Sequence, residues 1–100
     1  MTYRLWVQDG AKTEIRRLPG NVRQRLKREV AALSDEPRPL HSRLLRLPAG
    51  LDIEARRLRV DEWRVIYVVD DTASEVGILA VRRRPPYDYS DLPQLIAVSD

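Results

Sequence analysis

The chain has 100 residues, enough for one domain spanning residues 1–100, with a core too modest for an enclosed cofactor pocket. It contains no cysteine, which excludes a disulfide framework, a thiolate zinc site and a cysteine nucleophile. Eighteen lysine and arginine residues oppose fifteen acidic residues, for a net charge of +3, and only two of the eighteen are lysine. Arginine suits bidentate contact with phosphate, but a GC-rich genome also favours it. The positions of the arginines therefore have to show whether they serve to bind phosphate.

The sequence also limits where the protein acts and what it carries. No apolar run approaches the roughly 20 residues that cross a bilayer, and the N-terminus has no signal-peptide pattern. We therefore expect a cytoplasmic protein with no membrane partner. Neither a cluster of metal-ligating residues nor a Gly-rich phosphate loop is present, so no metal or organic cofactor is indicated.

The first third of the chain predicts a strand and two helices. Residues 3–7 alternate and are rich in β-forming residues, which indicates a short strand. A helix that Asp9 can cap follows, and it ends at Pro19-Gly20. A second helix is predicted over residues 21–34. The apolar positions that share a face in each helix are Ala11, Ile15 and Leu18 in the first, and Val22, Leu26, Val30 and Leu33 in the second.

The rest of the chain predicts a loop and an antiparallel sheet. Residues 36–50 read as a loop whose leucines 44, 45 and 47 anchor it to the core. Residues 57–60, 63–69 and 76–81 are β-prone, and their short turns favour a meander because parallel pairing needs long crossovers. The tail offers a short helical turn at Leu92, Leu95 and Ile96. The predicted fold class is α+β: an N-terminal strand, an α-helical hairpin on one sheet face, an antiparallel β-meander and a short C-terminal helix or tail.

Residues 57–67, Arg-Leu-Arg-Val-Asp-Glu-Trp-Arg-Val-Ile-Tyr, resemble the central hairpin of toxins of the RelE/ParE superfamily, which belong to bacterial type II toxin–antitoxin pairs. Leu18-Pro19, Leu33 and Pro37 with the Leu-rich loop resemble the upstream part of these toxins, and residues 81–84 with a following tyrosine resemble their last strand and tail. Asp61-Glu62 replaces the common Gly-Asp. A two-residue turn usually needs positive φ, so the substitution predicts a longer or strained turn.

Strand alternation places Arg57 and Arg59 on one face, opposite Leu58 and Val60. Arg64 shares a face with Ile66 and Val68, while Trp63 and Tyr67 are expected in the core. Outward arginines are often only a solvated surface. The resemblance implies that Arg57, Arg59, Arg64 and Arg84 grip an RNA backbone.

The resemblance further implies a ribosome-dependent endoribonuclease that cleaves messenger RNA by attack of a 2′-hydroxyl on phosphorus and so inhibits translation. Such a reaction needs a base, cationic donors and an acid, and arginine can serve only as the donor. The catalytic residues implied are Arg64, Arg84 and Tyr89, with Tyr89 as base or stacking platform. RNA-binding roles fall to Arg57, Arg59, Arg82, Arg83 and Tyr87. The one histidine, His41, matches no catalytic position of the superfamily and is expected to be an exposed loop residue.

Two other functions remain open on the sequence. The gyrase-inhibiting branch of the same superfamily shares the fold and would make DNA gyrase the partner, although the Arg64, Arg84 and tyrosine set favours RNA. A non-catalytic RNA-binding or interaction module would use the same arginines only to hold phosphate. Either toxin reading implies a cognate antitoxin, acidic and partly disordered, that folds onto the toxin; the ribonuclease reading adds the ribosome and messenger RNA as partners.

Overall fold

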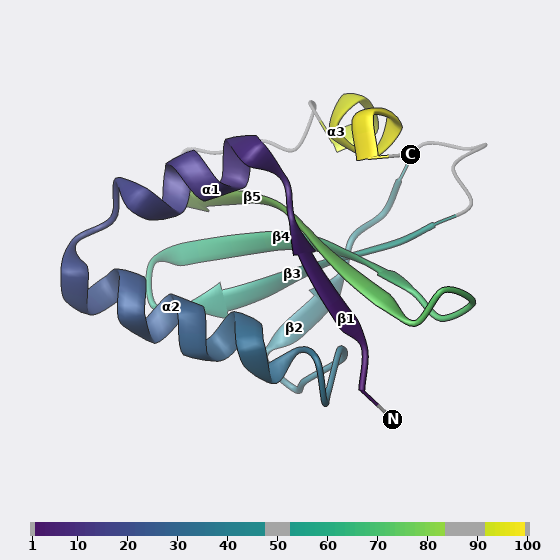
Figure 1. Cartoon of the computed structure of the whole chain (residues 1–100), viewed down its shortest axis with the longest axis horizontal. Helices are drawn as coiled ribbons and strands as arrows, with labels where there is room; N and C mark the ends of the chain where they lie inside the picture. Colours follow the sequence, from purple (N-terminus) through teal and green to yellow (C-terminus); the bar gives the residue numbers. More distant parts are fainter. Residues whose placement is uncertain (1, 48–52, 84–91, 100) are drawn as a thin grey trace.

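The computed structural model describes residues 2–47, 53–83 and 92–99, and these form a five-stranded sheet with three helices (Figure 1). The elements in chain order are β1 Arg4–Val7, α1 Asp9–Arg16, α2 Gly20–Ala32, β2 Ser42–Leu44, β3 Glu54–Val60, β4 Trp63–Asp70, β5 Glu75–Arg83 and α3 Leu92–Ser99. The strands lie in the order β1-β5-β4-β3-β2. Only the β1–β5 pair is parallel, and the other pairs are antiparallel. The α+β class and the meander predicted from the sequence are confirmed.

The helical hairpin of α1 and α2 covers one face of the sheet, as predicted (Figure 1). The main core lies between them, and all but one of the apolar positions predicted on the two helices are buried in it; Val22 is half-buried and packs against it. From the sheet this core takes Leu58 and Val60 of β3 and Val65, Tyr67 and Val69 of β4. Trp63 is half-buried against the same cluster, so the expected core position of both aromatics is confirmed.

Helix α3 is longer than the single turn predicted and packs on the opposite sheet face. Ile96 is buried with Ala55, Val68 and Leu79, whose side chains point away from the helical hairpin. Trp6 of β1 is half-buried against the same cluster. Among the described residues no helix has the length and apolar character needed to cross a membrane.

Two details of the predicted loop at residues 36–50 are wrong. Ser42–Leu44 forms the edge strand β2, which pairs antiparallel with β3. Leu44 is 64% exposed and is no core anchor, because the outermost strand has a neighbour on one side only. Leu45 and Leu47 are half-buried and pack against the smaller clusters, as predicted.

The β3–β4 turn is not lengthened by the Asp61-Glu62 pair. Val60 pairs with Trp63 in register, so the turn consists of Asp61 and Glu62 alone. Asp61 takes the positive φ of 55°, a conformation that aspartate tolerates better than glutamate. An ion pair with Arg25 of α2 holds the Asp61 carboxylate against the helix.

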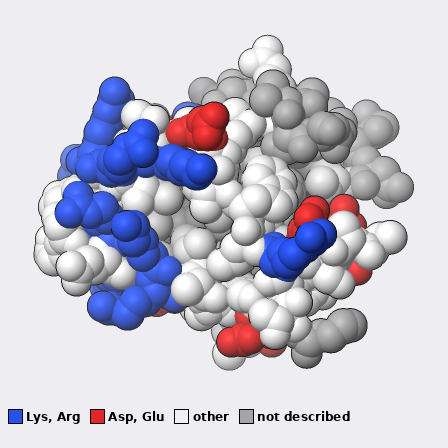
Figure 2. Space-filling view, viewed as in Figure 1, with Lys and Arg blue, Asp and Glu red and all other residues white. Residues whose placement is uncertain are grey.

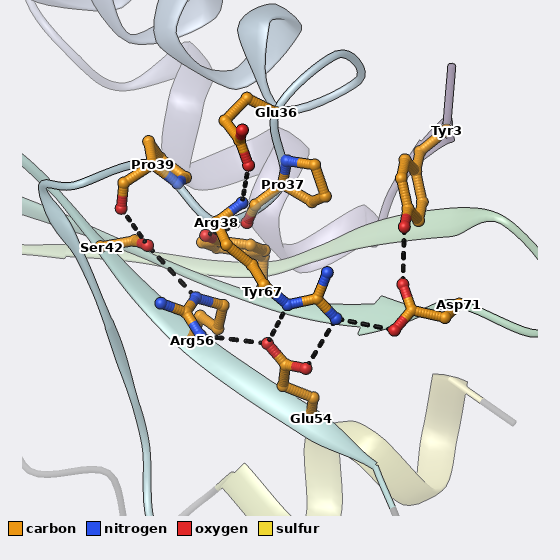
Figure 3. Close-up of polar contacts among 10 residues, drawn as sticks. All are labelled: Tyr3, Glu36, Pro37, Arg38, Pro39, Ser42, Glu54, Arg56, Tyr67 and Asp71. Atoms are coloured by element: carbon orange, nitrogen blue, oxygen red, sulfur yellow. Dashed lines mark hydrogen bonds and ion pairs between the residues drawn. The ribbon is translucent and has the colours of Figure 1, made fainter. Parts of the chain in front are cut away.

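A charged network ties the segment after α2 to the sheet (Figure 3). Arg38 donates to both carboxylate oxygens of Glu54, at 3.0 and 2.8 Å, and to Oδ2 of Asp71 at 2.8 Å. The Tyr3 hydroxyl donates to Oδ1 of Asp71 at 2.6 Å. The Arg38 guanidinium therefore joins β3 to the β4–β5 turn, and the Asp71 carboxylate joins that turn to the start of the chain.

Buried hydrogen bonds fix the chain immediately before β2. The buried Tyr67 hydroxyl donates to the carbonyl of Pro37 at 2.7 Å, and the Ser42 hydroxyl donates to that of Pro39 at 2.7 Å. Arg56 of β3 donates from Nε to Ser42 Oγ at 3.2 Å (Figure 3). These contacts set where the chain enters β2.

Acid should destabilise the protein through Glu54 and Asp71. Hydrogen bonding to Arg38 holds the pKa of Glu54 below its usual value, and hydrogen bonds from Tyr3 and then Arg38 lower the pKa of Asp71. A carboxyl with a lowered folded-state pKa stabilises the fold above its unfolded pKa of about 4, and this contribution is lost as the pH falls through the folded value. We expect the urea midpoint to fall between about pH 5 and 2, and less steeply in an Arg38→Met variant. Equal slopes for the two proteins would contradict a role of this network in acid unfolding.

Candidate nucleic-acid interface

A groove of about 510 Å³ opens over β2, β3 and the start of β4. Its described lining is mostly arginine: Leu40, His41, Arg43, Arg57, Arg59 and Arg64. The six residues come from the turn before β2 and from three neighbouring strands. The β2–β3 and β3–β4 pairings therefore create the groove.

Strand alternation and register explain why the arginines converge. Leu58 is buried under the helices, so its neighbours Arg57 and Arg59 project from the opposite face. Arg43 lies directly across from Arg57, and Arg64 directly across from Arg59. Residues opposite each other in an antiparallel pair share a face. The predicted shared face of Arg57 and Arg59 is therefore observed, and Arg64 and Arg43 join it.

Arg64 is held rigidly in the groove. It is only 6% exposed, and its Nη1 donates to the carbonyls of Asp61 and Trp63, both at 2.9 Å. Two backbone carbonyls therefore hold one end of the guanidinium in place, and the side chain is protonated at neutral pH. This is a preorganised cation at the start of β4.

Arg43 and Arg59 are exposed, and within residues 2–47, 53–83 and 92–99 no carboxylate pairs with either guanidinium. Four arginine charges thus share one groove whose described lining contains no acidic residue. A concave surface lined by charges of one sign attracts ligands of the other sign. The groove is suited to a phosphate-bearing ligand.

The other predicted RNA-binding arginines lie outside this lining. Arg82 is opposite Arg64 in register, but its Nε forms an ion pair with Glu14 of α1 at 2.8 Å. Arg83 pairs with Glu62 at 2.9 Å and lies opposite Trp63, on the helix side of the sheet. Arg84, Tyr87 and Tyr89 lie outside the described residues.

The structure brings His41 to the groove, a position that was not predicted from the sequence. His41 is exposed in a turn, as expected, with 42% of its side chain accessible. Yet it lines the arginine groove, and its Nε2 lies 3.2 Å from Oε2 of Glu29 on α2. The position of His41 was missed because β2 was not predicted. Only the pairing of β2 with β3 places the preceding turn beside Arg59.

Among the described residues that line the groove, His41 is the one proton-transfer side chain. Burial raises the pKa of Tyr67, whose hydroxyl is occupied by Pro37, so this tyrosine is unsuited to act as a base. No group of three or more His, Cys, Asp or Glu side chains in the described part of the chain could hold a metal ion.

A second basic surface covers the helical hairpin, and Figure 2 shows lysines and arginines gathered over α1 and α2. Between β1 and these helices lies an apolar groove of about 430 Å³. Its floor includes Leu5, Ile15 and Leu26, and its cations are Lys12, Arg16 and Lys27. Such a groove suits an apolar segment that also carries acidic residues.

The fold is similar to that of small toxins of known structure. A RelE–RelB complex from the archaeon Pyrococcus horikoshii OT3 matches with a TM-score of 0.76 and 26% identity, covering 87% of this chain and 100% of that chain. The RelBE2 toxin–antitoxin complex of Mycobacterium tuberculosis matches with a TM-score of 0.71 and 26% identity, over 84% and 93% of the two chains. The intact E. coli RelBE complex matches with a TM-score of 0.60 and 27% identity, over 81% and 95%.

The family model of the ParE toxin of type II toxin–antitoxin systems, parDE, matches residues 7–85. The chain therefore belongs to this toxin family, within the RelE/ParE superfamily that the hairpin resembles. No curated protein matches the sequence.

Proposed function

We propose that this toxin is a ribosome-dependent endoribonuclease that cleaves messenger RNA and so inhibits translation. The observation that carries the proposal is the convergence of Arg43, Arg57, Arg59 and Arg64 on one groove. Charge develops on the phosphate as the 2′-hydroxyl attacks, and preorganised cations aimed at that charge lower the barrier. The similarity to RelE structures supports the same branch of the superfamily.

Within this proposal the two kinds of arginine act differently. Exposed Arg43 and Arg59 hold the RNA backbone, while buried Arg64 supplies a fixed donor to the reacting phosphate. Catalytic roles for Arg84 and Tyr89, and RNA contacts for Arg82, Arg83 and Tyr87, remain predictions that substitution of each residue would test.

Inhibition of DNA gyrase is the second candidate, because the family model that matches is that of the ParE toxin. A gyrase inhibitor needs no proton-transfer group beside a cationic groove. The arrangement of His41 and four arginines in one groove therefore favours the ribonuclease. A module that binds RNA without cleaving it would use the arginines alone.

The proposed protein partner is a cognate antitoxin with an acidic, partly disordered segment. The similar solved structures include complexes of RelE with RelB. The apolar groove beside the helical hairpin, rimmed by Lys12, Arg16 and Lys27, has the complementary chemistry for such a segment. An acidic segment that orders on this surface would neutralise the basic hairpin.

Induction of the chain in a cell tests the proposal, with and without the protein of the neighbouring gene. We expect growth arrest with new messenger RNA 5′ ends inside translated frames, and relief by the neighbouring protein. Arg59→Ala should remove the cuts because it deletes an exposed phosphate contact. Arg4→Ala is the control, since Arg4 pairs with Glu75 on the far edge of the sheet and lies outside the groove.

Each alternative function gives a different result in the same cells. Arrest with intact messages and broken DNA would assign the protein to gyrase inhibition. Absence of arrest, with RNA binding retained by the purified protein, would assign it to a non-catalytic module. Loss of cutting in Arg4→Ala to the same degree as in Arg59→Ala would contradict the assignment of the groove.

A further inference from the structure

The carbonyl of His41 accepts a hydrogen bond from the backbone N–H of Arg59 at 3.2 Å. This bond fixes the backbone of His41 beside Arg59, which itself lines the groove. The imidazole itself lines the groove together with Arg43, Arg57, Arg59 and Arg64. His41 is thus a proton-transfer side chain placed directly among the phosphate-binding cations.

Glu29 defines which ring nitrogen of His41 can accept a proton. The Glu29 carboxylate on α2 lies 3.2 Å from Nε2, and an ionised carboxylate can only accept a hydrogen bond. The proton of the neutral ring therefore sits on Nε2, and the lone pair lies on Nδ1. A carboxylate that orients an imidazole in this way also stabilises the cation formed when the ring takes up a proton.

We propose that His41 is the general base of the cleavage reaction and that Glu29 is its positioning residue, an inference that rests on the proposed ribonuclease function. Nδ1 of His41 takes the proton of the 2′-hydroxyl while the 2′-oxygen forms its bond to phosphorus. The bond from phosphorus to the 5′-oxygen breaks, and that oxygen takes a proton from water. The products are a 2′,3′-cyclic phosphate and a 5′-hydroxyl end.

The charges around His41 oppose one another. Glu29 of α2 lies against the ring, and Arg43 of β2, Arg57 and Arg59 of β3 and Arg64 of β4 line the same groove. A general base has to be unprotonated to act, so the pH profile of cleavage reports whether His41 has this role. Glu29→Gln keeps the shape of the partner but removes its charge, so the cation that forms as the ring takes the proton loses its stabilisation and cleavage should slow.

The test is single-turnover cleavage of messenger RNA on purified ribosomes as a function of pH. His41→Ala and His41→Gln should lower the rate by about 100-fold or more and abolish its rise with pH. Binding of the toxin to programmed ribosomes should stay within about two-fold of wild type, and added imidazole should partly restore cleavage by His41→Ala. Glu29→Gln should cleave more slowly, with binding to programmed ribosomes unchanged. Glu75→Gln, which removes the carboxylate that pairs with Arg4 of the edge strand β1, is the matched control and should behave as wild type.

The failure of this inference is distinct from that of the proposed function. If wild-type toxin does not cleave ribosome-bound message, the proposed function fails and the role of His41 fails with it. If wild type cleaves and both His41 variants keep its rate and pH profile, only the role of His41 is overturned. Slow cleavage by the His41 variants that imidazole does not restore, with cleavage by Glu29→Gln at the wild-type rate, would make His41 a structural residue and also overturn the inference.

Discussion

Arg64→Ala should lower the rate of messenger RNA cleavage by about 100-fold or more, the effect of removing one preorganised donor from a charged transition state. The loss should exceed that of Arg59→Ala, because Arg64 is buried and fixed by two carbonyls whereas Arg59 is exposed. Arg64→Lys should recover little, since lysine cannot hold both carbonyls and a phosphate in one plane. Single-turnover cleavage on purified ribosomes measures all three variants.

The same substitution should also reduce stability. Without the guanidinium, the carbonyls of Asp61 and Trp63 lose their donors at the β3–β4 turn, which costs about 1–3 kcal/mol. Urea unfolding of Arg64→Ala, with Arg4→Ala as the control, measures this loss of stability separately from the loss of cleavage. Cleavage at the wild-type rate by a folded Arg64→Ala protein would show that Arg64 only supports the turn.

The arginine face could be predicted from the sequence because strand alternation is a local property. Leu58 and Val60 have to be buried, and this alone turns Arg57 and Arg59 to the other face. The helical hairpin follows in the same way from its apolar spacing. The geometry of the β3–β4 turn was harder to predict. Two acidic residues are adjacent there, and the positive φ falls on Asp61 because aspartate tolerates it better than glutamate.

The contribution of the β2 region could not be predicted, since it depends on pairing between distant segments. Ser42–Leu44 is too short to show a period, and its partner β3 begins ten residues after it ends. Without β2 the sequence gives no reason to place His41 or Arg43 beside Arg59. The parallel pairing of β1 with β5 was likewise hidden, because the pattern of residues 3–7 predicts a strand but not its neighbour.

Gly77→Ala should destabilise the protein by about 1–3 kcal/mol, the usual cost of forcing an extra group into a packed site. Gly77 of β5 lies beside Trp6 of β1, and a Cβ on Gly77 would stand 1.9 Å from Cζ2 of the indole. The ring must move, and with it the packing of Trp6 against the cluster beneath α3. Urea unfolding measures the change, and Gly10→Ala is the control, since no atom lies within 4 Å of a Cβ there.

A double-mutant cycle identifies the indole as the cause. Trp6→Ala alone should destabilise the protein by removing the ring from the cluster, but in the Gly77→Ala background it should cost less, because it also relieves the clash. Gly10→Ala should be neutral or slightly stabilising, since alanine favours the helix by up to about 1 kcal/mol. Additive effects of the Trp6 and Gly77 substitutions would mean that the new methyl group is accommodated elsewhere. Strong coupling would show that the parallel contact between β1 and β5 depends on glycine at position 77.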